Sequence, residues 1–510
     1  MDWLTLPEPR KNINLAFLDP LTAKAWLATQ PQAQPMHMLA AISLQIEAIE
    51  GTSLPPAQAI ELLNVMRTVA APIQEAIESR YVRKALPMLD DDQRSFEVAQ
   101  RLWLRLGTAY LRVAPHFAPA EKCLPLYRAA CAFRMAEYCH FLAARECPRL
   151  LDQLLFAVLT QAESSGQLRK ALPDPDFPQF GEANIAGHLS WAFMLRLVDP
   201  YRLSAAQLAV ANRAISRWRE LASFQAIPDD DPSGHSVDLA PIFGDPLPQG
   251  VPRWLDVRKV THKIDQRIKA LAQGESPESL KLGRELSPTA CIRLLRELEA
   301  SLEVRPQQQA TEIGEIELAF GADYAYAAFT GEMLVASGAL DAGSATLAHQ
   351  RVAMFGFDRV STMPTAVKKL NVPGENWLLV DGKAIRPADR RGARRQSPCL
   401  IATTSLGAPR LGVMVGLQSI SGGALAADLC WYDERIEAGR LARAPQDHHL
   451  PVTPVFLLHD GETCMLVAPS IAGIRLNSSL TLEGASVRQV IPTEVLERGV
   501  DFVRYAVNKP

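Results

Sequence analysis

The sequence predicts an α+β protein of more than one domain, in which an N-terminal all-α part is followed by a small antiparallel β-barrel. Up to about residue 305, apolar residues recur at steps of three and four, as they do on the buried face of a helix. Beyond that point, short runs rich in β-branched and aromatic residues alternate with turn signals, as in a barrel or sandwich. The 510 residues also exceed the roughly 250–300 at which a single core stops growing.

The helical part, residues 1–305, is expected to be a scaffold of stacked antiparallel helices. One apolar stripe runs from Leu39 to Ile49 at helical spacing. The three aspartates Asp90–Asp92 predict a helix start, because carboxylates there meet unpaired backbone N–H groups and the positive end of the helix dipole. The chain has 37 prolines against 29 glycines, which favours helices with sharply defined starts.

A proline-rich loop, residues 228–253, interrupts this helical pattern and contains the three consecutive acids Asp229–Asp231. Loops of this length in compact domains tend to be functional or to link elements. After the loop, Trp254 is expected to begin a helix that ends at Gly274, where a glycine can form the C-terminal cap.

The main domain boundary is placed in a polar, glutamine-rich linker, residues 306–312, where helical periodicity stops. Residues 313–395 are expected to be a mixed segment leading into the barrel, and residues 396–510 to be the barrel-like domain. The predicted strands are Asn376–Val380, Leu400–Thr404, Arg410–Leu417, Leu425–Tyr432, Val455–His459, Cys464–Val467, Arg475–Leu480, Val487–Ile491 and Phe502–Val507.

Composition and the N-terminal residues predict a cytoplasmic protein. The net charge of −3 argues against a surface that tracks a nucleic-acid polymer. The first nine residues contain an acid and two prolines where a signal peptide needs a basic start and an unbroken apolar run. The most apolar stretch, Leu150–Leu159, is shorter than the roughly 18 residues that a membrane span requires, so no span is expected.

Four of the eight cysteines, Cys123, Cys131, Cys139 and Cys147, recur at steps of eight. On a helix, eight residues at about 100° each leave an offset of about 80°, so these thiols do not share one face. A zinc site needs ligand pairs two to four residues apart. We therefore expect buried structural thiols and no metal site.

No catalytic motif is found, and we predict no catalytic residue and no cofactor. The chain has no phosphate-binding loop ending in Lys-Ser/Thr, no Gly-x-Gly-x-x-Gly after a strand, no His-Glu-x-x-His and no Gly-x-Ser-x-Gly. His459-Asp460 is interpreted as part of a hairpin turn, because Asp-Gly is a preferred turn pair. His448-His449 is interpreted as an exposed loop.

One local excess of positive charge stands out, in the segment from Lys383 to Arg395, which has Asp389 as its single acid. Its cations are Lys383, Arg386, Arg390, Arg391, Arg394 and Arg395. Because the planar arginine fork binds phosphate or carboxylate at two points, the segment is a candidate anion site. A solvated basic loop, or a loop that pairs with acids of the helical half, is the alternative.

The order of helical region, polar linker and small barrel is similar to bacterial PilZ-domain proteins. The stretch Glu375–Arg386 resembles the barrel strand that leads into the Asp/Asn-x-Ser-x-x-Gly motif of that family. Asp381 stands at the acidic position, whereas Lys383 replaces the Ser and Arg386 replaces the Gly. The region of the family's Arg-x-x-x-Arg arm corresponds to 351–359, but here that spacing occurs downstream, for example at Arg390 and Arg394.

The resemblance implies a barrel and an arginine-bearing segment that bind cyclic di-GMP. Arg390, Arg391, Arg394 and Arg395 would clamp the phosphates, and Asp381 would accept a hydrogen bond from guanine. Lys383 and Arg386 complete the candidate ligand-binding set. The predicted function is that of a non-enzymatic bacterial regulatory or adaptor protein, which relays to an unidentified protein partner through the helical domain. Alternatively, the barrel has lost the nucleotide and is kept as an interaction module.

A second hypothesis comes from a different class. The proline-rich loop 228–253 could supply a hydrolase site built from residues such as Asp229–Asp231 and His235. An enzyme of this kind would gather these polar groups in a pocket, whereas an adaptor would leave them scattered and exposed.

Overall fold

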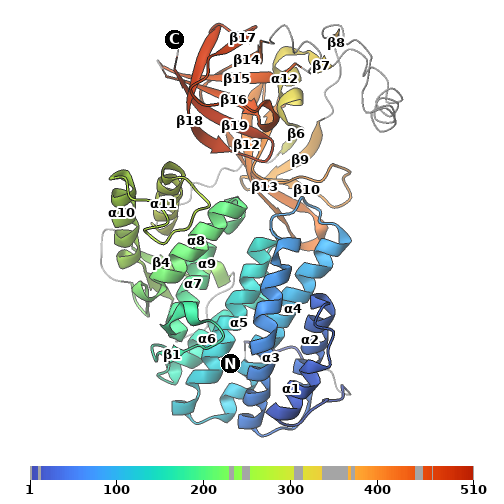
Figure 1. Ribbon diagram of the computed structural model, residues 1–510, viewed down its shortest axis with the longest axis vertical. Coiled ribbons are helices and arrows are strands. Elements are labelled where there is room, and N and C mark those ends of the chain that lie inside the picture. Colours follow the sequence, from blue (N-terminus) through green and yellow to red (C-terminus); the bar gives the residue numbers. More distant parts are fainter. Residues whose placement is uncertain are drawn as a thin grey trace. The chain divides into compact units, whose positions relative to one another are not determined.

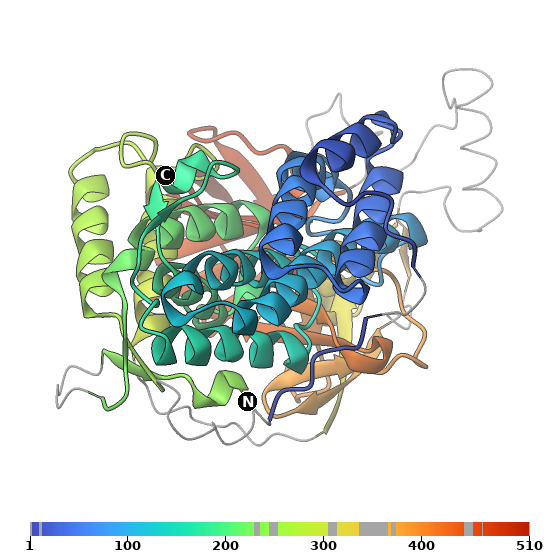
Figure 2. The same cartoon turned by 90° about the horizontal axis from the view of Figure 1, so that it is seen from below.

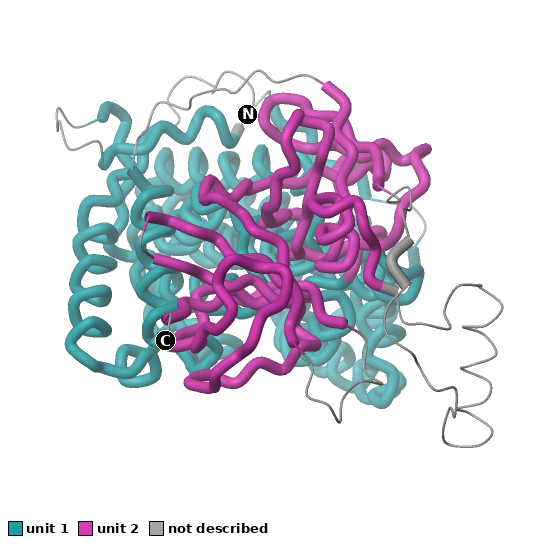
Figure 3. The backbone as a smooth tube through the Cα atoms, turned by 90° about the horizontal axis from the view of Figure 1, so that it is seen from above, with its two compact units in different colours: residues 1–84, 88–307 teal, residues 85–87, 308–510 magenta. Residues whose placement is uncertain are grey.

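The structure is a computed structural model that describes residues 3–9, 13–228, 235–243, 253–303, 314–335, 366–368, 374–442, 452–461 and 463–508. The chain divides into two compact units, coloured separately in Figure 3. Unit 1 comprises residues 1–84 and 88–307, and unit 2 comprises residues 85–87 and 308–510. The three residues 85–87 therefore belong to the C-terminal unit although they lie within the helical part of the sequence.

Unit 1 is built mainly of α-helices, with α1 and α2 at one margin and α10 at the opposite margin (Figures 1 and 2). The helices are α1 (Pro20–Ala28), α2 (Pro35–Gly51), α3 (Pro56–Ile77), α4 (Asp90–Val113), α5 (Cys123–Leu142), α6 (Arg149–Ser164), α7 (Ile185–Leu197), α8 (Ala205–Trp218), α9 (Ala240–Phe243), α10 (Arg258–Ala272) and α11 (Pro288–Leu302). Short strands accompany them: β1 (Leu172–Pro173), β2 (Glu182–Ala183), β3 (Ser223–Gln225), β4 (Ser236–Asp238) and β5 (Trp254–Asp256).

The helix starts follow the signals in the sequence. Proline occupies the first turn of α1, α2, α3 and α11, where its missing N–H is not needed. Helix α4 begins at Asp90 with all three aspartates in its first turn, as predicted. The helix predicted from Trp254 is wrong at its start, since Trp254–Asp256 pairs with β3 and β4. The Asp256 carboxylate accepts the Arg258 N–H, and α10 begins there.

Helices α4 and α5 approach closely because Gly107 of α4 leaves room for the ring of Phe133. A Cβ at position 107 would come within 2.4 Å of that ring. The regularly spaced cysteines are buried free thiols, as predicted. For Cys139 of α5, burial raises the pKa of the thiol to about 12.

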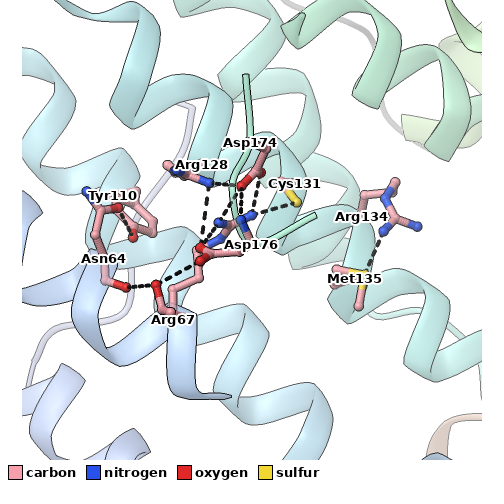
Figure 4. Close-up of polar contacts among 10 residues, drawn as sticks. Asn64, Arg67, Tyr110, Arg128, Cys131, Arg134, Met135, Asp174 and Asp176 are labelled. Atoms are coloured by element: carbon pink, nitrogen blue, oxygen red, sulfur yellow. Dashed lines mark hydrogen bonds and ion pairs between the residues drawn. The ribbon is translucent and has the colours of Figure 1, made fainter. Parts of the chain in front are cut away.

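A buried ion network fixes the segment after β1 to the helices (Figure 4). Arg67 of α3 binds Asp174 through its two terminal nitrogens, Nη2 at 2.7 Å and Nη1 at 2.9 Å, and also pairs with Asp176. Arg128 of α5 pairs with the same Asp174. Burial alone would raise the pKa of Asp174, but the bonds and charges of the two arginines outweigh it and hold the pKa below its ordinary value. The acid is therefore ionised and paired on both sides.

Unit 2 contains two closed barrels of six antiparallel strands each (Figure 1). In the first barrel the order is β10-β13-β12-β11-β6-β9, and in the second it is β14-β15-β16-β19-β18-β17. The first uses β6 (Gly314–Phe320), β9 (Glu375–Val380), β10 (Lys383–Arg386), β11 (Cys399–Thr403), β12 (Arg410–Ser419) and β13 (Leu425–Trp431). The second uses β14 (Arg435–Leu441), β15 (Pro454–Asp460), β16 (Thr463–Pro469), β17 (Leu480–Glu483), β18 (Gln489–Arg498) and β19 (Phe502–Asn508). A separate pair is formed by β7 (Met333–Val335) and β8 (Ala366–Lys368).

The predicted α+β class, with a helical N-terminal part and an antiparallel barrel after it, is confirmed. The sequence predicted one barrel, whereas the C-terminal unit has two. The difference arises because residues 313–395, expected to lead into the barrel, supply three strands of the first barrel. The strand predicted at Arg475–Leu480 is wrong, because β17 begins only at Leu480.

The two barrels share an apolar core with helix α12 (Ala322–Thr330), which follows β6. Leu400 and Val413 of the first barrel belong to the same buried cluster as Phe456 and Phe502 of the second. The Asp501 carboxylate also accepts the Leu400 N–H at 3.0 Å. Unit 2 is therefore one packed body. Across the described part of the chain, no helix combines the length and the apolar character needed to cross a membrane.

We predict that Arg67→Met destabilises unit 1 by about 3–5 kcal/mol, because it leaves the buried Asp174 and Asp176 short of a cation. Urea denaturation followed by tryptophan fluorescence measures the change. The control is Arg94→Met, which breaks a pair with Asp91 whose side chains are 68% and 88% exposed, and which should change stability by at most about 0.5 kcal/mol. Equal effects of the two substitutions would contradict the assigned role of the network.

Candidate anion-binding site

The predicted arginine segment forms the loop between β10 and β11, and it is fixed by the carboxylate of Glu375 at the start of β9. Arg386, the last residue of β10, is 4% exposed and places Nη1 2.8 Å from Glu375 Oε2. The same nitrogen donates to the Ala393 carbonyl at 2.9 Å, so Arg386 binds both the strand and the far side of its own loop. Its guanidinium also lies over the Trp377 ring.

Arg395, at the end of the loop, holds the other oxygen of the same carboxylate. Its Nη2 and Nε lie 2.5 and 3.1 Å from Glu375 Oε1, and its guanidinium carbon lies 3.8 Å from the centre of the Phe320 ring. The Ala393 N–H donates to Oε1 at 2.9 Å. Burial by itself would raise the pKa of Glu375, but these bonds and charges keep the pKa below its ordinary value.

Gly392 is needed where the loop passes over this cluster. A Cβ there would lie 2.3 Å from Arg386 Nη1 and 3.0 Å from Glu375 Oε2. A side chain at position 392 would therefore displace the two groups that hold the loop.

Three arginines of the loop point away from this cluster. Arg390 pairs with the exposed Glu315 of β6 at 2.7 Å. Arg394 is exposed and donates to the carbonyls of Pro87 and Ala85 at 2.8 and 3.0 Å. Arg391 is exposed, and no ion pair is found for it among the described residues. Arg391 and Arg394 are therefore the arginines of the loop for which no carboxylate partner is found among the described residues.

Asp381 and Lys383 lie at the opposite end of the β9–β10 hairpin. Val380 pairs with Lys383, so Asp381 and Gly382 form a two-residue turn, and their positive φ angles of 50° and 77° suit that turn. Lys383 faces Asp428 of β13 at 3.6 Å. Since strands rise about 3.3 Å per residue, Asp381 lies about 15 Å from Arg386. The structure thus brings Arg386 and Arg395 together at Glu375, places Arg390, Arg391 and Arg394 on the loop between them, and leaves Asp381 and Lys383 at the other end of the hairpin.

The glycine-rich turn Ser421–Gly423 borders the arginine loop. The strands that carry the two segments are paired, with Arg386 opposite Leu425. A Cβ at Gly423 would lie 3.7 Å from that of Ala388. Gly422 and Gly423 both have positive φ, so the turn keeps a backbone that side chains would strain.

The acids that pair with the loop, Glu375 and Glu315, both come from the first barrel. Pairing with acids of the helical half was the alternative, and the ion pairs found for the described loop lie within unit 2. Neither glutamate was among the predicted site residues. Glu315 alternates with the apolar Ile316 and Leu318 in β6, and this alternation was the available signal. No local signal pointed to Glu375.

Of the candidate hydrolase residues, His235 lies within the described part of the chain. His235 lines a cavity of about 780 Å³ with cations of α10 and the acids Glu299 and Glu303. Asp229–Asp231, 351–359 and His448-His449 lie outside the described residues, so the hydrolase alternative stays a prediction. Within the described ranges, no group of three His, Cys, Asp or Glu side chains is placed to hold a metal ion.

Residues 21–230 match the family model described as cyclic-di-GMP receptor FimW, N-terminal domain. The matched residues run from α1 to just beyond β3, which is less than half of the chain and does not include the arginine loop. No curated protein and no solved structure matches the chain.

We predict that Glu375→Gln destabilises unit 2 by about 2–4 kcal/mol at neutral pH, because two guanidinium groups lose the carboxylate they share. Because the pKa of Glu375 is lowered in the fold, its contribution is present above the ordinary glutamate pKa and is lost as the pH falls through the lowered value. The difference between wild type and variant should therefore narrow in acid. Urea denaturation at pH 7 and near pH 4 measures it.

The matched control for this prediction is Glu315→Gln, which removes a carboxylate that is 66% exposed and holds Arg390 alone. Its effect should stay within about 1 kcal/mol at either pH. A loss as large as that of Glu375→Gln, or a Glu375→Gln effect that does not change with pH, would contradict the assignment.

Proposed function

We propose that this chain is a bacterial cyclic di-GMP receptor that acts as a regulatory or adaptor protein in the cytoplasm and not as an enzyme. The observation that carries the proposal is the match of residues 21–230 to the N-terminal domain of a cyclic-di-GMP receptor family. The arginine loop on the first barrel supports it independently, because it offers the chemistry that a ligand with two phosphodiester groups requires.

The phosphate-binding groups are assigned to Arg391, Arg394 and Arg390. Arg391 and Arg394 are exposed and lack a carboxylate partner among the described residues, so a phosphate meets two guanidinium groups without first breaking an ion pair. Arg390 is held by one exposed glutamate, a contact of the kind that contributes little in water. The planar guanidinium can also stack on a guanine base.

Arg386 and Arg395 are assigned a supporting role in this site. Both are bound to the partly buried Glu375, and removing them from it would leave that carboxylate uncompensated. They fix the ends of the loop, so that the three arginines between them are presented together.

The PilZ-like assignment of the first barrel remains part of the proposal. A closed six-stranded antiparallel barrel with an arginine loop beside a glycine-rich turn supports it. The role of Asp381 as a guanine acceptor requires the ligand, or a second ligand molecule, to reach the hairpin turn about 15 Å from Arg386. Lys383 would act at that same end.

A relay to a protein partner is proposed through residues 85–87. Their carbonyls accept hydrogen bonds from Arg394, and Leu86 pairs with Arg395 through both backbone groups. A phosphate that recruits Arg394 competes with these carbonyls. Because the chain continues from Lys84 and Met88 into helical elements, release of this segment would be transmitted to the helical unit, which would bind the partner.

Isothermal titration of the full chain with cyclic di-GMP tests the proposal. We expect the wild-type chain to bind saturably with a Kd below 0.1 mM, which corresponds to a binding free energy more favourable than about −5.5 kcal/mol. Arg391→Ala and Arg394→Ala should each weaken binding about tenfold or more, since each removes a charge-assisted contact of about 1.5–3 kcal/mol. Higher salt should weaken binding of wild type as well.

The control variant is Arg410→Ala, which removes an exposed arginine at the start of β12, outside the loop, and should leave the affinity unchanged. Absence of heat with wild type at 0.1 mM would overturn the receptor proposal. Wild-type binding that both loop variants retain would leave a receptor whose nucleotide site lies elsewhere, and would overturn the assignment of the arginine loop.

A further inference from the structure

The second barrel places a cysteine, a histidine and a glutamate in contact, an arrangement outside the arginine loop. His459 of β15 and Cys464 of β16 are direct partners in the register of the hairpin, with Cys464 Sγ 3.9 Å from His459 Nδ1. The other ring nitrogen, Nε2, lies 3.1 Å from Oε2 of Glu437 on β14. One imidazole therefore bridges a thiol and a carboxylate.

The three side chains share the inner face of the barrel near one end. Direct partners in an antiparallel pair point to the same face, as do residues two apart on one strand. Glu437 is the partner of Leu457, which precedes His459 by two, and both Leu457 and Cys464 belong to the buried core of this barrel. Cys464 therefore packs against the apolar core of the barrel, and His459 lies nearer the solvent, with its side chain 14% exposed.

Ser486, in the turn between β17 and β18, fixes the carboxylate. Its N–H and its hydroxyl each donate to Glu437, to Oε1 and Oε2 respectively, at 2.6 Å. Burial alone would raise the pKa of Glu437, but the Ser486 and His459 contacts outweigh it and keep the pKa below the ordinary value. The carboxylate is therefore ionised and orients the ring.

This geometry selects one tautomer of His459. An ionised carboxylate only accepts, so Nε2 carries the hydrogen and donates it to Glu437. The Nδ1 lone pair is then directed at the Cys464 thiol, in the arrangement that takes a proton from a nucleophile whose base is oriented by a third group. Arg435, the direct partner of His459 on β14, is exposed at the same end of the barrel.

We propose that Cys464 is a redox-reactive thiol, deprotonated by His459, that a small hydroperoxide oxidises to a sulfenic acid. The thiolate sulfur attacks one peroxide oxygen, the S–O bond forms and the O–O bond breaks. Sulfur loses two electrons to the peroxide, and the leaving hydroxide or alkoxide takes the proton from the His459 imidazolium and departs as water or alcohol. The residue is 4% exposed and lies second in its strand, at the end of the barrel, so a hydroperoxide of minimal size is the fitting oxidant.

The remaining cysteines provide internal standards. Cys399 of the first barrel is equally buried, and burial raises the pKa of its thiol well above the ordinary value. Cys430 is the exposed cysteine of the same unit. Accessibility alone therefore predicts that Cys430 reacts first and that Cys464 and Cys399 react slowly together. Activation by His459 instead predicts that Cys464 reacts faster than both Cys430 and Cys399.

The experiment treats the full chain with hydrogen peroxide in the presence of a 1,3-dicarbonyl trap for sulfenic acid, and follows each cysteine by peptide mass spectrometry. In wild type, Cys464 should be labelled at least tenfold faster than Cys399 and faster than Cys430. His459→Gln should slow Cys464 at least tenfold and leave Cys430 unchanged, and Glu437→Gln should slow it severalfold. His116→Gln, which changes an exposed histidine of unit 1, is the matched control with no expected effect.

If Cys464 is labelled no faster than Cys399 in the wild-type chain, the proposal is overturned, and no variant is needed for that conclusion. A His459→Gln protein that keeps its thermal midpoint and the wild-type rate at Cys464 would overturn it as well. Cys464→Ser should remove the labelled peptide and leave the rate at Cys430 unchanged.

Discussion

The arrangement of the first barrel depends on one partly buried carboxylate, that of Glu375. The Glu375 carboxylate is stable at the start of β9 because Arg386, Arg395 and the Ala393 N–H donate hydrogen bonds to it and the two arginines balance its charge. A buried charge without such partners costs several kcal/mol, so these contacts are obligatory once the strand is in place. They bind the two ends of the arginine loop to each other. The loop between them therefore has fixed ends and a solvent-facing middle.

The same principle operates in the helical unit with the opposite outcome. Asp174 is surrounded by Arg67 and Arg128, both buried, so the network is closed and presents no charge to solvent. In the arginine loop the cations outnumber the acids, and Arg391 and Arg394 have no carboxylate partner among the described residues. Asp174 and Glu375 each fix the position of a chain segment through ion pairs with arginines. Only the second leaves cations available to a ligand, which is why the candidate site lies on the barrel.

The sequence pattern was sufficient to predict those helices and strands that are determined by residues close together in the chain. Helix α4 begins at Asp90 because three carboxylates meet its N-terminus, and β15 and β16 follow apolar runs flanking an Asp-Gly turn. The alternation in β6 was a signal, but a short one at the edge of the unassigned segment. Strands β6 and β14 were not predicted, because they are stabilised by partners distant in sequence. The roles of Glu375 and Glu437 escaped for the same reason. Glu437 lies 22 residues before His459, and pairing across strands brings them together.

The two barrels thus hold chemistry of different kinds. In the first, charge exists before any ligand arrives, and an anion is attracted at long range and screened by salt. In the second, a charge pair forms when the proton moves from sulfur to the ring, between a fixed carboxylate and the apolar core of the barrel. Phe456 and Leu458, whose neighbours in β15 face the Cys464 side, belong to the core shared with the first barrel. Oxidation of Cys464 would therefore change the polarity beside a strand that both barrels use for packing.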